Sequence, residues 1–167
     1  ALQGVRVIEM GQLIAGPFCG KTLGEFGADV IKIEAPETGD PLRNWRLIKE
    51  GTSVWWQVQS RNKRSVALDL RQKEGQDIAR QLIAEADVLV ENFRPGTLEA
   101  WGMSPEELHQ LNPGLVMLRI SGYGQTGPYR DLPGFGAIGE AMGGLRHLTG
   151  EPGRVPVRVG VSIGDTL

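Results

Sequence analysis

The feature that most constrains the fold is a strand, a helix and a second strand within residues 5–34. Two short apolar runs, VRVIEM at residues 5–10 and DVIKIE at residues 29–34, predict buried strands. Between them a helix is expected over residues 17–26, because Pro17 suits the first helical position and Gly27 suits the residue after the last turn. A unit of this length predicts two parallel strands joined by a right-handed crossover.

The same alternation continues along the chain. Apolar runs predict three further strands, at residues 65–70, 87–91 and 115–121. Periodic segments predict three further helices, at residues 72–86, 105–112 and 137–142. The helix at 105–112 follows a capping box formed by Ser104 and Glu107. We therefore expect a single domain over residues 1–167, an open, doubly wound α/β sheet of the Rossmann-like kind with mostly parallel strands.

One segment does not fit the alternation. Residues 35–60 contain prolines, glycines and no clear period, and we expect a long irregular loop. Trp45, Trp55 and Trp56 lie in it. We expect them to anchor the loop by packing, and a binding platform is the alternative.

Ligands of open parallel sheets bind at the carboxyl ends of the strands. Those ends are expected at residues 11–16, from residue 34 onward, at 92–96 and at 122–127. The first turn lacks the glycine spacing of a dinucleotide fingerprint, so we expect no standard dinucleotide site. The free N–H groups of the following helix suit a phosphate or a carboxylate.

Charge and composition exclude several classes of function. Lysine and arginine number 18 against 20 acidic residues, which gives no electrostatic reason to expect nucleic acid as a partner. The single cysteine, Cys19, fits a reducing cytoplasm, and no leader or membrane-spanning run is expected. The two histidines, His109 and His147, lie far apart in sequence without nearby cysteines, so no metal site is expected.

Two local features each permit two interpretations. The basic cluster at residues 61–64 (RNKR) suits either one small polyanion or a solvated turn. Asp165 stands on a Gly-Asp step after a short apolar run, where it is either a helix N-cap or a reactive carboxylate. No G-x-S-x-G elbow or other nucleophile–base pattern accompanies it.

Five segments in order and spacing resemble the family III coenzyme A transferases. They are residues 14–17 (IAGP), 27–34 (GADVIKIE) with Gly39-Asp40 close behind, 62–70 (NKRSVALDL), 91–96 (ENFRPG) and 121–128 (SGYGQTGP). The resemblance covers essentially the whole chain, which equals less than half of a typical member. It implies an N-terminal portion of a larger fold, lacking a second domain and a returning C-terminal segment, and a homodimer in the full-length protein.

The resemblance places Asp165 at the position of the catalytic aspartate of the family. It implies transfer of CoA from an acyl-CoA to a carboxylic acid through aspartyl anhydride and aspartyl-CoA thioester intermediates, which is covalent catalysis. Coenzyme A or acyl-CoA then enters as a substrate, and neither a metal nor a nucleoside triphosphate is needed. The acyl donor and acceptor are not named by the sequence.

The resemblance also assigns binding positions. Those that match CoA-binding residues of the family are Gln12, Leu13, Ala15, Lys63, Arg64, Asn92, Phe93 and Arg94. Those expected to face the transferred acid are Phe135, Tyr123 and Gln125. The chain departs from several relatives at Ala35, where they carry an arginine, and one phosphate or adenine contact is therefore in question.

Two other functions stay open. The same fold hosts α-methylacyl-CoA racemases, which use a histidine in a Gly-His-Asp step, but Phe135 stands at that position and cannot accept a proton. The chain can also be a CoA-binding remnant without turnover. We expect residues 1–167 alone to have little transferase activity, because segments that shield the reactive intermediate from water are missing.

Overall fold

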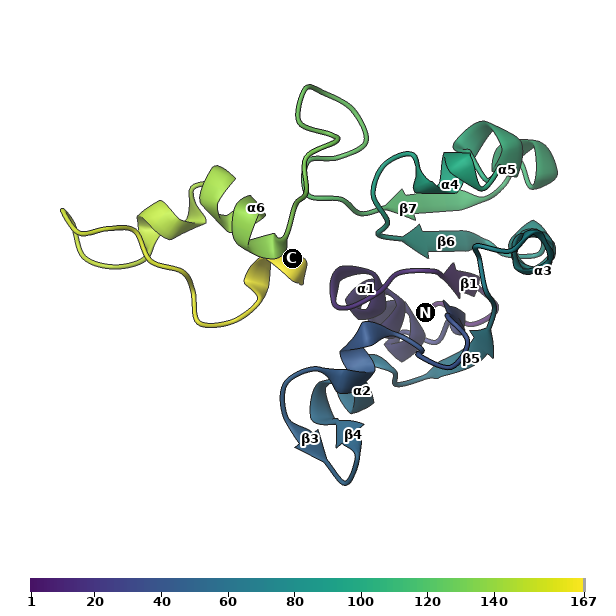
Figure 1. Ribbon diagram of the computed structural model, residues 1–167, viewed down its shortest axis with the longest axis horizontal. Coiled ribbons are helices and arrows are strands. Elements are labelled where there is room, and N and C mark those ends of the chain that lie inside the picture. The colour runs from purple at the N-terminus through teal and green to yellow at the C-terminus, as the bar shows by residue number, and fades with distance from the viewer. Residues whose placement is uncertain (167) are drawn as a thin grey trace. The chain divides into compact units, whose positions relative to one another are not determined.

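The computed structural model describes residues 1–166, which form two compact units divided after Ile120. The first unit contains a five-stranded sheet of order β5-β2-β1-β6-β7, in which every neighbouring pair is parallel (Figure 1). Its strands are β1 (Arg6–Glu9), β2 (Asp29–Glu34), β5 (Lys63–Ala67), β6 (Val88–Glu91) and β7 (Val116–Arg119). This confirms the predicted open α/β sheet.

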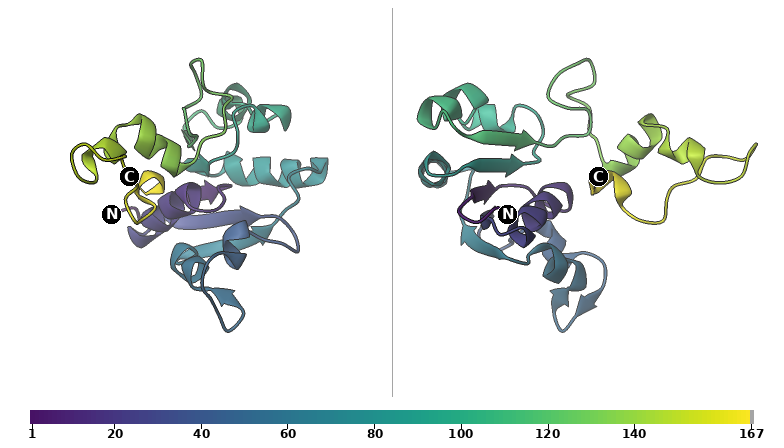
Figure 2. Two further views of the ribbon diagram at one scale, coloured as in Figure 1. Left: turned by 60° about the vertical axis from the view of Figure 1, so that its left-hand side comes forward. Right: turned by 180° about the vertical axis from the view of Figure 1, so that it is seen from behind.

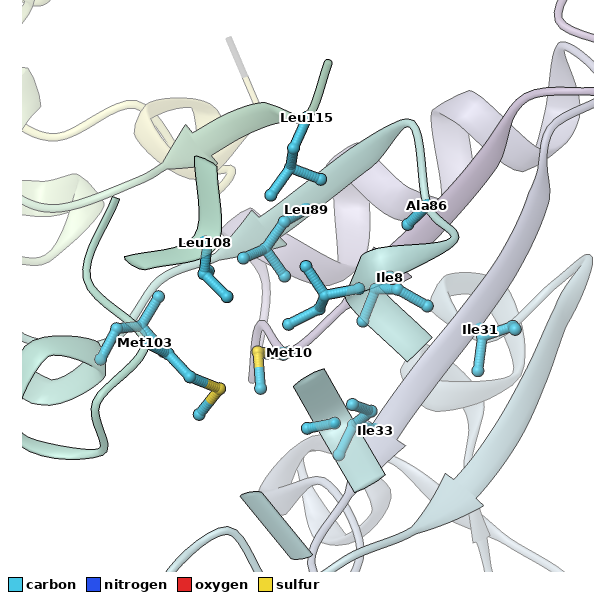
Figure 3. Close-up of a cluster of buried hydrophobic side chains, with 12 residues drawn as sticks. Ile8, Met10, Ile31, Ile33, Ala86, Leu89, Met103, Leu108 and Leu115 are labelled. Carbon is cyan, nitrogen blue, oxygen red and sulfur yellow. The ribbon is translucent and has the colours of Figure 1, made fainter. Parts of the chain in front are cut away.

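Alternating side chains of the strands enter two hydrophobic layers, one on each face of the sheet. Ile8, Met10, Ile31, Ile33 and Leu89 point to the larger core (Figure 3). That core is completed from α3 (Lys73–Ala84), α4 (Thr97–Ala100) and α5 (Pro105–Leu111). The opposite face carries Val7, Val30 and Val90 beneath α1 (Ala15–Glu25), so helices cover both faces (Figure 2).

Helix α1 lies very close to the sheet because its buried face contains glycines. Gly16, Gly20 and Gly24 are all buried. A Cβ atom on Gly20 would lie 1.9 Å from Oε2 of Glu9, which is much closer than two non-bonded atoms can approach. The first crossover helix therefore depends on residue size as well as on hydrophobic pattern.

Residues 35–60 are more ordered than predicted. They form a short 3-10 helix η1 (Pro41–Asn44), a hairpin of β3 (Ile48–Lys49) and β4 (Thr52–Ser53), and α2 (Val54–Gln59). These elements are too short to leave a period in the sequence. The starts of η1 and α2 are set by the side chains of Asp40 and Ser53, which accept hydrogen bonds from backbone N–H groups.

The tryptophans of this segment support the packing interpretation. Trp56 is buried, and the Arg43 guanidinium lies 4.0 Å from the centre of its ring. The rings of Trp45 and Trp55 are 6.4 Å apart.

The second unit begins at Ser121 and contains α6 (Gly136–Met142) and the 3-10 helices η2 (Leu145–Leu148) and η3 (Ile163–Asp165). One domain is predicted over residues 1–167, whereas the chain packs as two units, and the single domain stays a prediction. Among the helices of residues 1–166, none combines the length and the apolarity needed to cross a membrane.

Candidate active site

The turn after β1 is held by the residue that follows β6. The backbone N–H of Gln12 donates to Oδ1 of Asn92 at 2.7 Å, and Nδ2 of Asn92 donates to the Gln12 carbonyl at 2.9 Å. Beneath them Gly11 and Gly16 touch through their backbones, since a Cβ on Gly11 would lie 2.6 Å from the Gly16 Cα. The structure thus joins two predicted CoA-binding residues at the carboxyl ends of β1 and β6.

Leu13 gives this turn an uncommon backbone. Its φ is 63°, in the left-handed region that residues other than glycine seldom adopt. Its N–H donates to Oδ1 of Asp40 at 3.0 Å, which stabilises that conformation. Ala15 follows as the first residue of α1.

Lys63 does not take the exposed position that binding a phosphate requires. Its side chain is 2% exposed, and Nζ lies 2.6 Å from Oε2 of Glu9 and donates to the Pro17 carbonyl at 2.7 Å. Burial lowers the pKa of Lys63, against the opposing effect of Glu9. In this structure its ammonium group is therefore enclosed between α1 and the sheet.

The rest of the basic cluster forms ion pairs at the surface. The Arg64 guanidinium contacts both carboxylate oxygens of Asp29, one of them at 3.0 Å, and Arg61 pairs with Glu25. Arg64 is exposed and can exchange this partner for a ligand anion, because exposed pairs contribute little free energy.

Phe93 and Arg94 follow β6. The Phe93 ring contacts Trp101 edge-on at 5.3 Å and packs against the larger core, while its N–H donates to Oε2 of Glu91 at 2.7 Å. Arg94 is exposed, and over residues 1–166 its guanidinium has no ion-pair partner. It is thus a cation open to a phosphate group at this edge of the sheet.

A shallow cavity of about 240 Å³ lies at the carboxyl ends of β2 and β5, and Ala35, Thr38, Gly39 and Ser65 help to line it. At its base Glu34 accepts hydrogen bonds from Nε and Nη2 of Arg43, both at 2.8 Å, and from Ser65 Oγ at 2.6 Å. Burial alone would raise the pKa of Glu34, but these bonds and the Asp40 N–H lower it to about 2. Arg43 was not predicted as a site residue, because its partner Glu34 lies nine residues away across an unpredicted turn.

In the second unit, Asp165 ends η3 with its carboxylate against the backbone of Gly136. A Cβ on Gly136 would lie 2.8 Å from the Asp165 Cγ, so only glycine permits this approach. Burial raises the pKa of Asp165, and a hydrogen bond from the Gly136 backbone and the charge of Arg158 oppose that rise. The carboxylate is half-buried without a direct ion pair among the described residues.

An ion pair between buried Glu140 and exposed Arg158 accompanies Asp165 and was not predicted. Glu140 of α6 is 3% exposed, and its Oε2 lies 3.4 Å from Nε of Arg158. The charge of Glu140 adds to the rise of the Asp165 pKa. No local signal in the sequence links these two residues, which are 18 positions apart.

The predicted acid-facing residues are more scattered. Phe135 precedes α6 and is 71% exposed, next to the glycine that contacts Asp165. The Tyr123 ring packs edge-on against Tyr129 at 5.6 Å, and Gln125 donates to Ser121 Oγ at 3.4 Å. The role of these three side chains stays a prediction.

A comparison of the sequence with known protein families matches nearly the whole chain to one family. The profile of CoA-transferase family III matches residues 2–167. The chain is 59% identical to succinyl-CoA–D-citramalate CoA-transferase of Chloroflexus aurantiacus, over 99% of this chain and 42% of that protein. It is 40% identical to human succinyl-CoA:glutarate CoA-transferase, over 98% of this chain and 38% of that protein.

A solved structure supports the same family assignment. The crystal structure of a CAIB/BAIF family protein from Brucella suis superposes with a TM-score of 0.90 at 42% identity, covering 98% of this chain and 44% of that one. The chain thus spans about two fifths of the length of the curated relatives it matches, between 38% and 42% for the two named here.

Proposed function

The chain belongs to CoA-transferase family III, and on that premise we propose that it supplies the nucleophile and part of the CoA site for transfer of CoA from an acyl-CoA to a carboxylic acid. The observation that carries the proposal is the setting of Asp165, a half-buried carboxylate against Gly136 to which no cation of residues 1–166 binds directly. Partial burial removes water from the carboxylate and raises its pKa, which makes the ionised form a stronger nucleophile.

The reaction balances without an added base. The Asp165 carboxylate attacks the thioester carbonyl of the donor, the C–S bond breaks, and CoA leaves as a thiolate from an aspartyl anhydride. The thiolate then attacks the aspartyl carbonyl and releases the donor acid, which leaves an aspartyl-CoA thioester. The acceptor carboxylate attacks that thioester and expels the thiolate, which finally attacks the acceptor carbonyl of the second anhydride. This last step forms the new acyl-CoA and regenerates Asp165.

The CoA molecule is proposed to lie along the carboxyl ends of the strands. Gln12, Leu13 and Ala15 offer backbone at the turn after β1, and Asn92 fixes that turn. Arg94 supplies an exposed cation for a phosphate, since charge-assisted bonds to phosphate are strong. The edge of the Phe93 ring completes the proposed contacts there, whereas Arg64 pairs with Asp29 at the amino ends of β5 and β2, and its contact with CoA stays a prediction.

A dicarboxylate chemistry is proposed for both acids. The names of several relatives pair succinyl-CoA with citramalate, malate or glutarate, all of which are dicarboxylates. We infer succinyl-CoA as the donor and a dicarboxylate as the acceptor. Racemisation is not proposed, because Phe135 offers no group that exchanges a proton. A homodimer, a cytoplasmic location and weak turnover by residues 1–167 alone stay predictions.

Mass spectrometry of trapped intermediates tests the proposal. The complete transferase is incubated with succinyl-CoA and quenched with borohydride, which reduces an acyl thioester to an alcohol, or with hydroxylamine. The modification is expected on the peptide that carries Asp165 and is expected to vanish in Asp165→Asn. Asp131→Asn, an exposed aspartate of the same unit, serves as the matched control and keeps the adduct. Transfer that persists in Asp165→Asn contradicts the proposal.

A further inference from the structure

Four charged side chains are buried beneath the turn after β1. Glu9, Lys32, Asp40 and Lys63 have side chains no more than 2% exposed. Lys32 Nζ lies 2.9 Å from Glu9 Oε1 and 2.9 Å from Asp40 Oδ2, and Lys63 Nζ lies 2.6 Å from Glu9 Oε2. Two cations and two anions alternate, so the network is neutral as a whole. Burial alone would lower the pKa of Lys32, but the two carboxylates raise it, which keeps that lysine charged.

Stability does not explain such a network. Removing charges from water costs free energy that their mutual attraction often only offsets, and apolar residues of similar volume serve a core equally well. Gly20 is also required in α1 to leave room for Glu9, which is a further constraint on the sequence. The network therefore points to a role beyond holding α1 on the sheet.

Three members of the network bind the backbone within the turn and just after it. Lys32 Nζ donates to the carbonyl of Gly11, the first residue of the turn, at 2.6 Å. Asp40 Oδ1 accepts the Leu13 N–H at 3.0 Å, within the turn. Lys63 Nζ donates to the Pro17 carbonyl at 2.7 Å, after the turn. The turn is thus fixed from below at three points, including the residue whose φ is 63°.

We propose that Glu9, Lys32, Asp40 and Lys63 together position the acyl-CoA-binding turn of residues 11–14, and that Lys63 acts through the backbone rather than on a phosphate of CoA. The inference rests on the proposed function, because it assigns the turn to CoA. A turn held in its binding conformation loses less entropy when the ligand binds. If loss of the network leaves the turn competent for only one tenth of the time, the apparent Kd rises about tenfold.

The test compares two ligands and two matched basic residues. In the complete transferase, Lys63→Met removes one member of the network, and Arg64→Met removes the neighbouring exposed cation. Kd is measured calorimetrically for CoA and for dephospho-CoA, which lacks the 3′-phosphate, at two salt concentrations. Lys63→Met is expected to weaken both ligands by the same factor, about tenfold, with the salt dependence of Kd unchanged.

Two further variants separate positioning from stability. Asp40→Asn keeps an acceptor for Leu13 but removes the charge beside Lys32, and it is expected to weaken both ligands by a smaller factor. Leu108→Ala opens the core on the opposite face of the sheet and lowers Tm without touching the turn. Its Kd values are expected to stay at those of the unmutated protein.

Each other result overturns the inference. If Lys63→Met weakens the binding of CoA but not of dephospho-CoA, or makes the Kd of CoA less dependent on salt, Lys63 is identified as a phosphate ligand. Unchanged Kd values in Lys63→Met and Asp40→Asn show that the network serves stability only. If Leu108→Ala weakens the binding of both ligands as much as Lys63→Met does, any loss of stability is enough to weaken binding. If the unmutated transferase binds neither ligand, the proposed function fails as well, which distinguishes the two failures.

Discussion

Replacing Gly20 of α1 by alanine tests whether the buried charges set how close this helix lies to the sheet. The new Cβ would lie 1.9 Å from Glu9 Oε2 and 2.8 Å from its Cδ. Glu9 cannot turn aside without leaving its partners, because Oε1 and Oε2 lie 2.9 and 2.6 Å from the ammonium groups of Lys32 and Lys63. Either the ion pairs break or the helix moves outward.

The magnitude follows from two opposing contributions. Alanine in place of glycine inside a helix stabilises by about 1 kcal/mol. Breaking a buried ion pair costs about 3–5 kcal/mol. Gly20→Ala should therefore lower the free energy of unfolding by about 2–4 kcal/mol. Gly24→Ala is the matched control in the same helix, since its Cβ would lie 3.3 Å from Asn62 and 3.4 Å from Val30, and it should stay within about 1 kcal/mol of the unmutated protein.

Urea unfolding followed by tryptophan fluorescence measures the difference. The four tryptophans, Trp45, Trp55, Trp56 and Trp101, all lie in residues 1–120, so the signal reports on the unit that contains α1. With a urea dependence of about 2 kcal/mol per molar, the middle of the usual range, the midpoint of Gly20→Ala should fall by about 1–2 M. Equal midpoints for Gly20→Ala and Gly24→Ala would refute the reasoning, because they would show that Glu9 moves without cost.

The remaining predictions concern pH. Asp165 must be ionised to attack, so the acid limb of kcat/KM should follow the pKa of Asp165. Glu140→Gln removes a charge that raises this pKa and should move the limb to lower pH, whereas Arg158→Gln removes a charge that lowers it and should move the limb to higher pH. A shift of both variants in one direction contradicts this. The hydrogen bonds of Glu34 outweigh its burial and lower its pKa from 4.5 to about 2. The ionised side chain therefore stabilises the fold fully above pH 4.5. This contribution, about 3 kcal/mol at most, is lost as pH falls from 4.5 to 2. Acid unfolding of Glu34→Gln should lack that loss, while Glu37→Gln, an exposed neighbour, should keep it.

Local patterns were enough to predict the sheet and its order of elements. β2 spans the predicted residues 29–34, and Ser104 and Glu107 form the predicted capping box at the start of α5. Both signals act over a few residues, through strand alternation in one case and through neighbouring N–H groups in the other. The carboxyl ends of the strands, where the site was sought, followed from the same patterns.

The elements of residues 35–60 were missed because each is shorter than the window in which a period is visible. Their ends are fixed by single side chains such as Asp40 and Ser53, which a sequence shows only as polar residues in a loop. Short-range chemistry of this kind is present in the sequence, but many alternative turns satisfy it equally well.

The sequence by itself determined the family, the parallel sheet and the position of Asp165 near the end of the chain. Only the tertiary structure decided what the buried charges do. The parallel register of β1 and β2 sets Glu9 beside Lys32, and Lys63 reaches Glu9 from a strand that begins 54 positions later. Lys63 looked like a phosphate ligand because a basic residue in a cluster is normally solvated. Its enclosure depends on α1 lying close enough to cover it, and that distance is set by glycines whose contacts exist only once the chain has folded.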